Sequence, residues 1–177
     1  LRESIQLEVR RLQRRLGLTT VFITHDQEEA LVLSDRIAVM DGGAIRQIGA
    51  PDEVYDRPAD AFVAHFIGES NLLAGEIAAP TRVRLDDGTS VTVGGLDGGR
   101  GRARFLVRPV KMAIDSDTKR LTGIVVEAVY LGETHKLRVR VAEGVELMVR
   151  GRHAVCAGAS VTVGFAPEDA HVIRGAG

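Results

Sequence analysis

The stretch that decides the fold is Thr20-Val21-Phe22-Ile23-Thr24-His25-Asp26-Gln27-Glu28-Glu29-Ala30. Its apolar beginning predicts a short buried strand over residues 19–24, and its acidic end is typical of the first turn of a helix. Open α/β sheets bind their ligands at the carboxyl edge, where each strand passes into the following helix. His25 stands at such a position and is therefore the candidate site residue.

Helical patterns lie on both sides of this stretch. One set of apolar residues has the spacing of a single helix face over residues 1–16: Leu1, Ile5, Val9, Leu12 and Leu16. The other face carries an arginine cluster that we interpret as solvated: Arg10, Arg11, Arg14 and Arg15. Gly17 follows where a helix C-cap belongs. Asp26 and Glu29 have capping-box spacing, so a second helix is expected from there to about Leu33.

Short elements follow along the chain. Residues 36–40 and 44–48 predict two strands joined by the hairpin turn Asp41-Gly42-Gly43. Pro51 and Pro58 each suit the first turn of a short helix, because proline has the fixed φ and the missing N–H that this position tolerates.

From residue 69 onward helical spacing is absent, and β-type runs alternate with glycine turns. Strands are predicted over residues 82–85, 89–93, 103–107, 122–131, 136–141, 145–150 and 160–165. Many short strands with regular turns indicate a small barrel or sandwich. We therefore predict an α+β chain with two domains, residues 1–68 and residues 69–177. Two strands that run into proline, at residues 106–109 and 164–169, raise the hypothesis of an internal duplication.

Composition limits the possible functions. The chain has 177 residues, 45% of them hydrophobic, which is enough for packed cores. The 23 basic and 24 acidic residues leave a net charge of −1, which does not favour binding nucleic acid or anionic lipid through bulk charge. Cys156 is the single cysteine and fits a reducing compartment. Because no apolar run reaches the ~18 residues of a membrane span, any work at a membrane requires docking onto an embedded partner.

Taken together, the motifs over residues 20–68 resemble the ATPase subunits of bacterial ABC importers, in the branch that serves maltose, polyamine, iron and sulfate import. Those motifs are Val-Phe-Ile-Thr-His-Asp-Gln-Glu-Glu-Ala, Leu-Ser-Asp-Arg-Ile-Ala-Val-Met, Gly-Ala-Ile-Arg-Gln-Ile-Gly and Pro-Asp-Glu-Val-Tyr. The β-rich part resembles the TOBE domain of that branch, an OB-like barrel, through Gly123-Ile124-Val125, Val129-Tyr130-Leu131-Gly132 and residues 164–169. The resemblance implies the C-terminal fragment of an α/β P-loop ATPase domain followed by an all-β barrel.

The resemblance also implies roles for particular residues. His25 matches the switch histidine, a catalytic residue that contacts the γ-phosphate of ATP and helps to hold the attacking water. Asp26, Gln27 and Glu29 match supports of the following helix, and Asp35 matches a family position near the end of that helix. Two further residues, Tyr55 and Phe62, match packing positions of a connector. The parent protein is expected to use ATP and Mg, to pair with a second copy, and to dock on an integral-membrane permease at the cytoplasmic, inner face of the membrane.

Several elements that ATP hydrolysis needs are absent from this sequence. It has no Gly-rich loop with lysine, no carboxylate for metal and water, no glutamine loop and no Ser-Gly-Gly signature. We therefore expect no cofactor-binding or metal-ligating residue in this chain, and no ATP hydrolysis by the chain alone. The TOBE-like part also has Arg108-Pro109-Val110 in place of the more usual Arg-Pro-Glu.

Two alternatives remain open from the residues. The β-rich part could be a regulatory or dimerisation module that binds a regulatory protein. It could instead be a small-ligand sensor, with an oxyanion held by arginines: Arg138, Arg140, Arg150 and Arg152. A plain solvent face is the simpler interpretation of those arginines. Nucleic-acid binding is not expected, because Phe105, Tyr130 and Phe165 lie in apolar runs typical of a core.

The remaining histidines and the cargo complete the predictions. Four histidines are interpreted as surface or packing residues: His65, His135, His153 and His171. Residues 66–73, Phe-Ile-Gly-Glu-Ser-Asn-Leu-Leu, are nearest to polyamine-type importers, which makes a polyamine the favoured cargo of the parent protein.

Overall fold

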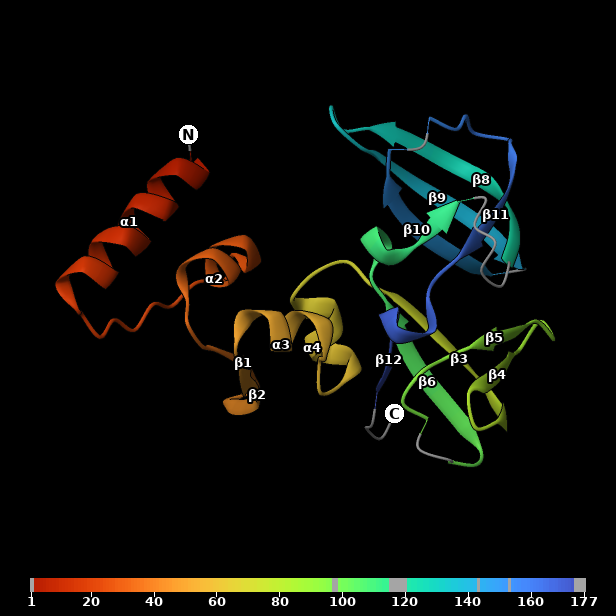
Figure 1. Ribbon diagram of the computed structural model, residues 1–177, viewed down its shortest axis with the longest axis horizontal. Coiled ribbons are helices and arrows are strands. Elements are labelled where there is room, and N and C mark those ends of the chain that lie inside the picture. The colour runs from red at the N-terminus through yellow and green to blue at the C-terminus, as the bar shows by residue number, and fades with distance from the viewer. Residues whose placement is uncertain (1, 97–98, 115–120, 143, 153, 174–177) are drawn as a thin grey trace. The chain divides into compact units, whose positions relative to one another are not determined.

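The computed structural model describes residues 2–96, 99–114, 121–142, 144–152 and 154–173 (Figure 1). The chain divides into two compact units, Leu1–Gly68 and Glu69–Gly177. We call them the first and the second unit. Within the described residues, the α-helices all lie in the first unit, and the second unit consists of strands, turns and two short 3₁₀ segments.

Short, locally determined elements build the first unit. In chain order they are α1 Arg2–Leu16, α2 Gln27–Leu33, β1 Ile37–Asp41, β2 Ala44–Gly49, α3 Pro51–Asp56 and α4 Ala61–Phe66. Gly42 and Gly43 join β1 to β2 with φ angles of 55° and 80°, the two left-handed residues that a type I′ hairpin requires. The predicted hairpin and the helices up to α3 are confirmed.

The strand predicted over residues 19–24 is wrong for this structure. The segment has no strand geometry, and Val21 and Ile23 are 87% and 94% exposed. A strand needs a neighbour that pairs with its backbone N–H and C=O groups. No sheet among the described residues includes this segment, so its apolar side chains face solvent.

Helix α1 contacts α2 through the face opposite to the expected one. Its apolar stripe is exposed at Ile5, Val9, Leu12 and Leu16. The arginine face, interpreted above as solvated, instead supplies ion pairs to the α2 region through Arg10 and Arg14. That interpretation is corrected for Arg10, whose side chain is 26% exposed, whereas Arg14 makes an ion pair and stays 60% exposed. The described residues contain no apolar surface against the stripe, so polar contacts set the orientation of the helix.

The helix predicted to begin at Pro58 begins later. Asp60 is the N-cap of α4, and its carboxylate accepts a hydrogen bond from the backbone N–H of Val63 at 2.9 Å. An aspartate satisfies an orphan donor at this end, which proline cannot do. A small core lies between the hairpin, α3 and α4: Ile37, Val39, Val54, Val63 and Ile67. Tyr55 and Phe62 pack against it, as predicted.

The second unit contains ten strands in the described residues. They are β3 Asn71–Ala79, β4 Arg82–Leu85, β5 Ser90–Thr92, β6 Arg102–Val107, β7 Ala113–Ile114, β8 Leu121–Tyr130, β9 His135–Ala142, β10 Val145–Gly151, β11 Ser160–Gly164 and β12 Ala170–Ile173. The 3₁₀ segments are η1 Pro109–Lys111, after β6, and η2 Pro167–Asp169, after β11. Seven strands agree with the prediction to within a few residues, whereas β3, β7 and β12 were not predicted.

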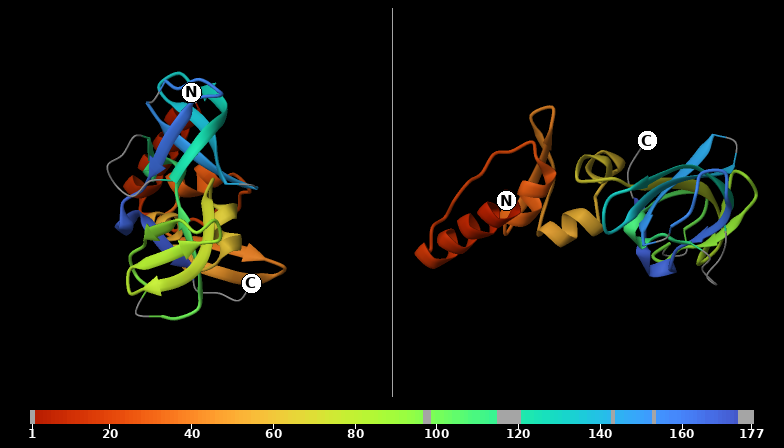
Figure 2. Two further views of the ribbon diagram at one scale, coloured as in Figure 1. Left: turned by 90° about the vertical axis from the view of Figure 1, so that its right-hand side faces the viewer. Right: turned by 90° about the horizontal axis from the view of Figure 1, so that it is seen from above.

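These strands form two five-stranded sheets around one core. The orders are β12-β6-β3-β4-β5 and β10-β9-β8-β11-β7, and every pairing is antiparallel. Figure 2 shows the strands of this unit curling around a common interior. Fully enclosed side chains from both sheets fill it, among them Val83, Phe105, Val139, Leu147 and Val163. This is the predicted OB-like barrel.

The barrel repeats one structural pattern twice. β3 to β7 and β8 to β12 each form a three-stranded meander, a strand that returns beside the first, a 3₁₀ turn, and a strand that crosses to the other sheet. The register repeats as well: Ile114 is opposite Val163, and the counterpart Val172 is opposite Phe105. Such a repeat in register is what an internal duplication produces.

A glycine occupies the same place in both repeats. A Cβ on Gly75 would overlap the carbonyl oxygen of Arg84, and a Cβ on Gly123 would overlap that of Arg140. Strands therefore approach each other more closely at these two points than any side chain would allow. Each glycine lies two residues before the bulged register of its hairpin.

Candidate functional site

His25 lies at a bend directly before α2, with an exposed side chain. The residue after it, Asp26, is the N-cap of the helix, and its carboxylate accepts a hydrogen bond from the backbone N–H of Glu29 at 3.0 Å. Because the cap fixes the backbone on the C-terminal side of His25, the imidazole projects from a defined helix start rather than from a free loop.

A hydrogen-bonded relay supports this helix start. The backbone N–H of Asp26 donates to Thr24 Oγ1 at 2.9 Å, and the Thr24 hydroxyl donates to Glu29 Oε2 at 2.8 Å. The expected capping box would have Glu29 return to the Asp26 N–H directly. Thr24 instead stands between them, so both residues beside His25 are tied to α2.

Arg2 of α1 completes the network and sets its charge. Its guanidinium lies 2.7 Å from both Asp26 Oδ2 and Glu29 Oε1. The pKa of Asp26 is held below its usual value by the Glu29 N–H and by Arg2, and that of Glu29 by Arg2 and by Thr24. The two carboxylates in turn raise the pKa of Arg2. Both acids are therefore charged at neutral pH, and they hold the start of the helix that follows His25.

A second contact holds α1 against the far end of α2. Arg10 and Arg14 approach Asp35 Oδ1 at 3.4 and 3.2 Å, and Arg10 also donates to the carbonyl of Val32. Cations and N–H donors at a helix C-terminus satisfy its free carbonyls. Asp35 was predicted only as a family position without a physical role. Its partners lie 21 and 25 residues away, too far for local sequence patterns to pair them.

The chemistry available here is that of one exposed imidazole on a fixed backbone. Such a group can donate a hydrogen bond to a ligand oxygen, or accept one from a ligand hydroxyl. Within the described ranges, no group of His, Cys, Asp or Glu is arranged to hold a metal ion. The double glycine Gly42-Gly43 belongs to a hairpin turn, and no phosphate loop is built from it.

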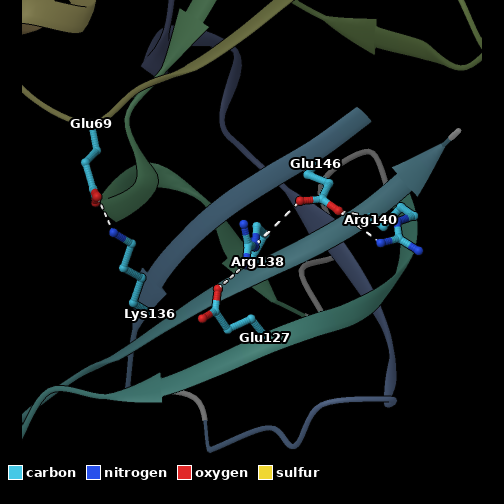
Figure 3. Close-up of polar contacts among 6 residues, drawn as sticks. All are labelled: Glu69, Glu127, Lys136, Arg138, Arg140 and Glu146. Atoms are coloured by element: carbon cyan, nitrogen blue, oxygen red, sulfur yellow. Dashed lines mark hydrogen bonds and ion pairs between the residues drawn. The ribbon is translucent and has the colours of Figure 1, made fainter. Parts of the chain in front are cut away.

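On the outer face of the barrel, two of the candidate anion-binding arginines already have acidic partners. Figure 3 shows a ladder in which Arg138 lies between Glu127 and Glu146, and Arg140 contacts Glu146 at 3.1 Å. Since two guanidinium groups face two carboxylates, the ladder is close to neutral. The geometry does not favour an oxyanion site at this pair. Arg150 and Arg152 are exposed, and no ion pair of theirs is found among the described residues.

The aromatic residues divide between the core and the surface. Phe105 and Phe165 are buried with ring centroids 6.0 Å apart, as predicted. The core prediction for Tyr130 is wrong: it is 68% exposed and lies against the His135 ring at 5.0 Å between centroids. Tyr130 is at the tip of the β8–β9 hairpin, beyond the last core-facing pair. His65 is exposed, His171 is partly buried, and His153 lies outside the described residues.

Comparisons with known proteins agree with this architecture. Residues 105–173 match the TOBE domain family. The chain is 40% identical to the spermidine/putrescine import ATP-binding protein PotA of Ruegeria pomeroyi over 98% of its own length and 50% of that protein. It is 39% identical to the Thermobifida fusca protein of the same name, over 99% of the chain and 50% of the relative. The chain corresponds to the C-terminal part of ABC-importer ATP-binding subunits, and it contains a domain of the TOBE family.

Other findings define the extent of the match. The PotA protein of Clostridium acetobutylicum is 37% identical over 98% of the chain and 49% of that protein. The chain thus spans about half the length of these curated relatives, and it corresponds to their C-terminal part. A solved structure of the molybdate-binding protein ModG covers 59% of the chain with a TM-score of 0.53 and 12% identity, which shows a shared fold alone.

In the part of the chain that the structure describes, no helix combines sufficient length with sufficient apolar character to cross a membrane.

Proposed function

We propose that the chain is the C-terminal portion of an ATP-hydrolysing subunit that couples hydrolysis to solute import. In this proposal residues 1–68 complete the ATPase domain, and residues 69–177 form the accessory TOBE domain. The observation that carries it is the match over 98% of the chain to import ATP-binding proteins, together with a capped helix that presents His25. The names of the relatives favour spermidine or putrescine as cargo.

In the complete protein, His25 would act on the γ-phosphate of ATP. Phosphoryl transfer depends on positioning and on stabilising charge at the phosphate oxygens, and it needs little covalent chemistry from the protein. An imidazole N–H aimed at one of those oxygens supplies such stabilisation. The cap at Asp26 and the relay through Thr24 and Glu29 would hold the imidazole's backbone in place during this step.

The residues of this chain do not fit ATP and Mg as a complete site. The described residues hold no metal-binding cluster, and the sequence has no phosphate-cradling loop with lysine. Magnesium and the remaining phosphate contacts would therefore come from the half of the subunit that corresponds to the rest of the relatives.

The exposed apolar surface of the first unit supports the same proposal. Residues 19–24 have the composition of a buried strand but pair with no strand of the described ranges, and the apolar stripe of α1 is exposed. Exposed apolar side chains that are grouped along a helix face and a neighbouring segment are typical of an interaction site. We propose that the rest of the ATPase sheet covers it, and that residues 19–24 become a strand when that sheet supplies a neighbour.

Further partners follow from the proposed function. A second copy of the subunit would complete the ATP sites, and an integral-membrane permease would receive the conformational change. The subunit would then be cytoplasmic and peripheral, on the inner face of the plasma membrane.

Calorimetry with Mg-ATP tests the division of the site. The chain alone should show no saturable heat of binding at micromolar nucleotide. A fusion that restores the N-terminal half of the Ruegeria pomeroyi relative should bind Mg-ATP. Micromolar binding by the chain alone would overturn the division, because it would place a nucleotide site within these residues.

A second candidate function is a regulatory or dimerisation module. The observation in its favour is that the second unit has its own core from two sheets and matches the TOBE family. Sedimentation of residues 69–177 expressed alone tests this function. A dimer at micromolar concentration supports it, whereas a monomer at all concentrations would show that the second unit does not dimerise by itself.

A further inference from the structure

Two polar residues are buried in the described part of the chain, and both hold the same short segment. Asn71 is 4% exposed and Arg108 is 2% exposed. Buried polar groups are costly unless hydrogen-bonded, so each is expected to have a structural purpose. The segment they hold is residues 69–71, where the second unit begins. We call residues 69–71 the junction segment.

The Asn71 side chain makes the hydrogen bonds that a neighbouring strand would otherwise make. Its Nδ2 donates to the carbonyl of Met148 at 2.8 Å, and its Oδ1 accepts from the Met148 N–H at 2.7 Å. Met148 lies on β10, the edge strand of its sheet, where backbone groups would otherwise lack a partner. One carboxamide therefore ties the start of β3 in one sheet to the free edge of the other.

Glu69 is held on both its backbone and its side chain. Arg108 Nη1 donates to the Glu69 carbonyl oxygen at 3.2 Å. The Glu69 carboxylate accepts from the ammonium group of Lys136 on β9 (Figure 3). With Asn71, these contacts fix the junction segment to Arg108, the residue directly before η1, and to β9 and β10 of the barrel.

The two structural repeats differ at the residues that contact the junction segment. In register, the counterpart of Arg108 is Ala166, which cannot reach a carbonyl in this way. Lys136 lies in residues 128–137 of the β8–β9 hairpin, where the first repeat has only Pro80 and Thr81 between the paired positions. The counterpart of Asn71 is position 119, outside the described residues. The buried arginine of the first repeat and the longer hairpin of the second repeat both contact the junction segment, and neither has a counterpart in the other repeat.

We propose that Asn71, Arg108 and Lys136 form a junction clamp, a conformational device that makes residues 69–71 a rigid part of the barrel. A displacement of the β8–β9 hairpin or of β10 is then transmitted to the residue at which the first unit ends. A partner that moves this hairpin separates Lys136 from the Glu69 carboxylate, and a partner that leaves the hairpin in place keeps this contact. The inference rests on the contacts within the second unit and is independent of the proposed ATPase role.

Amide hydrogen exchange on the 177-residue chain tests the clamp. In Asn71→Ala, the Met148 amide should exchange at least about tenfold faster, because it loses its only edge-side acceptor. In Lys136→Gln, peptides covering residues 66–72 should exchange up to about fivefold faster, the range of an exposed ion pair. Arg140→Gln is the matched control: it breaks an ion pair on the same strand that does not touch the junction segment, and both probes should stay unchanged.

A double-mutant cycle keeps the test decisive if Asn71→Ala does not fold. Glu69→Gln, Lys136→Gln and the double variant change exposed side chains only. If the pair acts as a clamp, the double variant exchanges at residues 66–72 no faster than either single variant. Additive effects, or equal loosening in Arg140→Gln, would overturn the clamp. So would unchanged Met148 exchange in a folded Asn71→Ala variant.

Discussion

The Asp26 carboxylate accepts the backbone N–H of Glu29 at 3.0 Å, and this bond makes His25 the last residue before a capped helix. The helix is only 7 residues long, so its start depends strongly on its cap. The backbone position of the candidate catalytic histidine is therefore a consequence of helix capping.

Removing the cap should melt the helix and release His25. Asp26→Ala leaves the Glu29 N–H without an acceptor, and we expect lower helical circular dichroism and a lower melting temperature of the first unit. Asp26→Asn is the control, since asparagine caps about as well as aspartate. Equal losses in both variants would mean that the ion pair with Arg2, and not the cap, holds this site.

Acid should loosen the same site. The folded-state pKa values of Asp26 and Glu29 lie below the unfolded values of 3.8 and 4.5. Their stabilisation is therefore complete above about pH 4.5 and is lost as the pH falls through the lower, folded values. Helical signal measured from pH 6 to pH 2 should decline within that acid range. In Arg2→Gln the midpoint of the decline should lie at higher pH, because the folded-state pKa values of both acids rise when Arg2 is removed; an unchanged midpoint would contradict this cause.

The paired glycines should resist substitution. Gly75→Ala and Gly123→Ala each place a Cβ on a neighbouring carbonyl, so we expect a loss of about 1–3 kcal/mol in unfolding free energy for each. Chemical denaturation of the second unit measures this loss. Thr122→Ala, at an exposed position of β8, should change stability by less than about 0.5 kcal/mol. Losses below that limit in both glycine variants would argue against the close strand approach.

Oxyanions should not stabilise the barrel through Arg138 and Arg140. Arg138 already faces Glu127 and Glu146, and Arg140 faces Glu146, so sulfate or molybdate at millimolar concentration should leave the melting temperature unchanged at constant ionic strength. A saturable rise that disappears in an Arg138→Gln variant would revive the sensor alternative.

Local patterns predicted the parts of this fold that local physics determines. The β1–β2 hairpin follows from Gly42-Gly43, and α2 follows from its capping residue. Residues 19–24 failed because a strand depends on its neighbour, and β3 was missed because its alanines and Gly75 lack a β-type pattern. The position of His25 before a helix could be predicted from the sequence, because the capping residue Asp26 and its partner Glu29 lie within four residues of it. The contacts of Asp35 with α1 and of Asn71 with β10 join distant residues, and only the structure shows them.

The proposed role of His25 is to act at the γ-phosphate of ATP in a complete subunit. The most direct test is the ATPase rate of a fusion that restores the N-terminal half from the Ruegeria pomeroyi relative, assayed with its permease. His25→Ala should lower kcat by about 100-fold or more, the effect of losing one transition-state hydrogen-bond donor, while the melting temperature stays unchanged. An active fusion whose rate is unaffected by His25→Ala would contradict the claim.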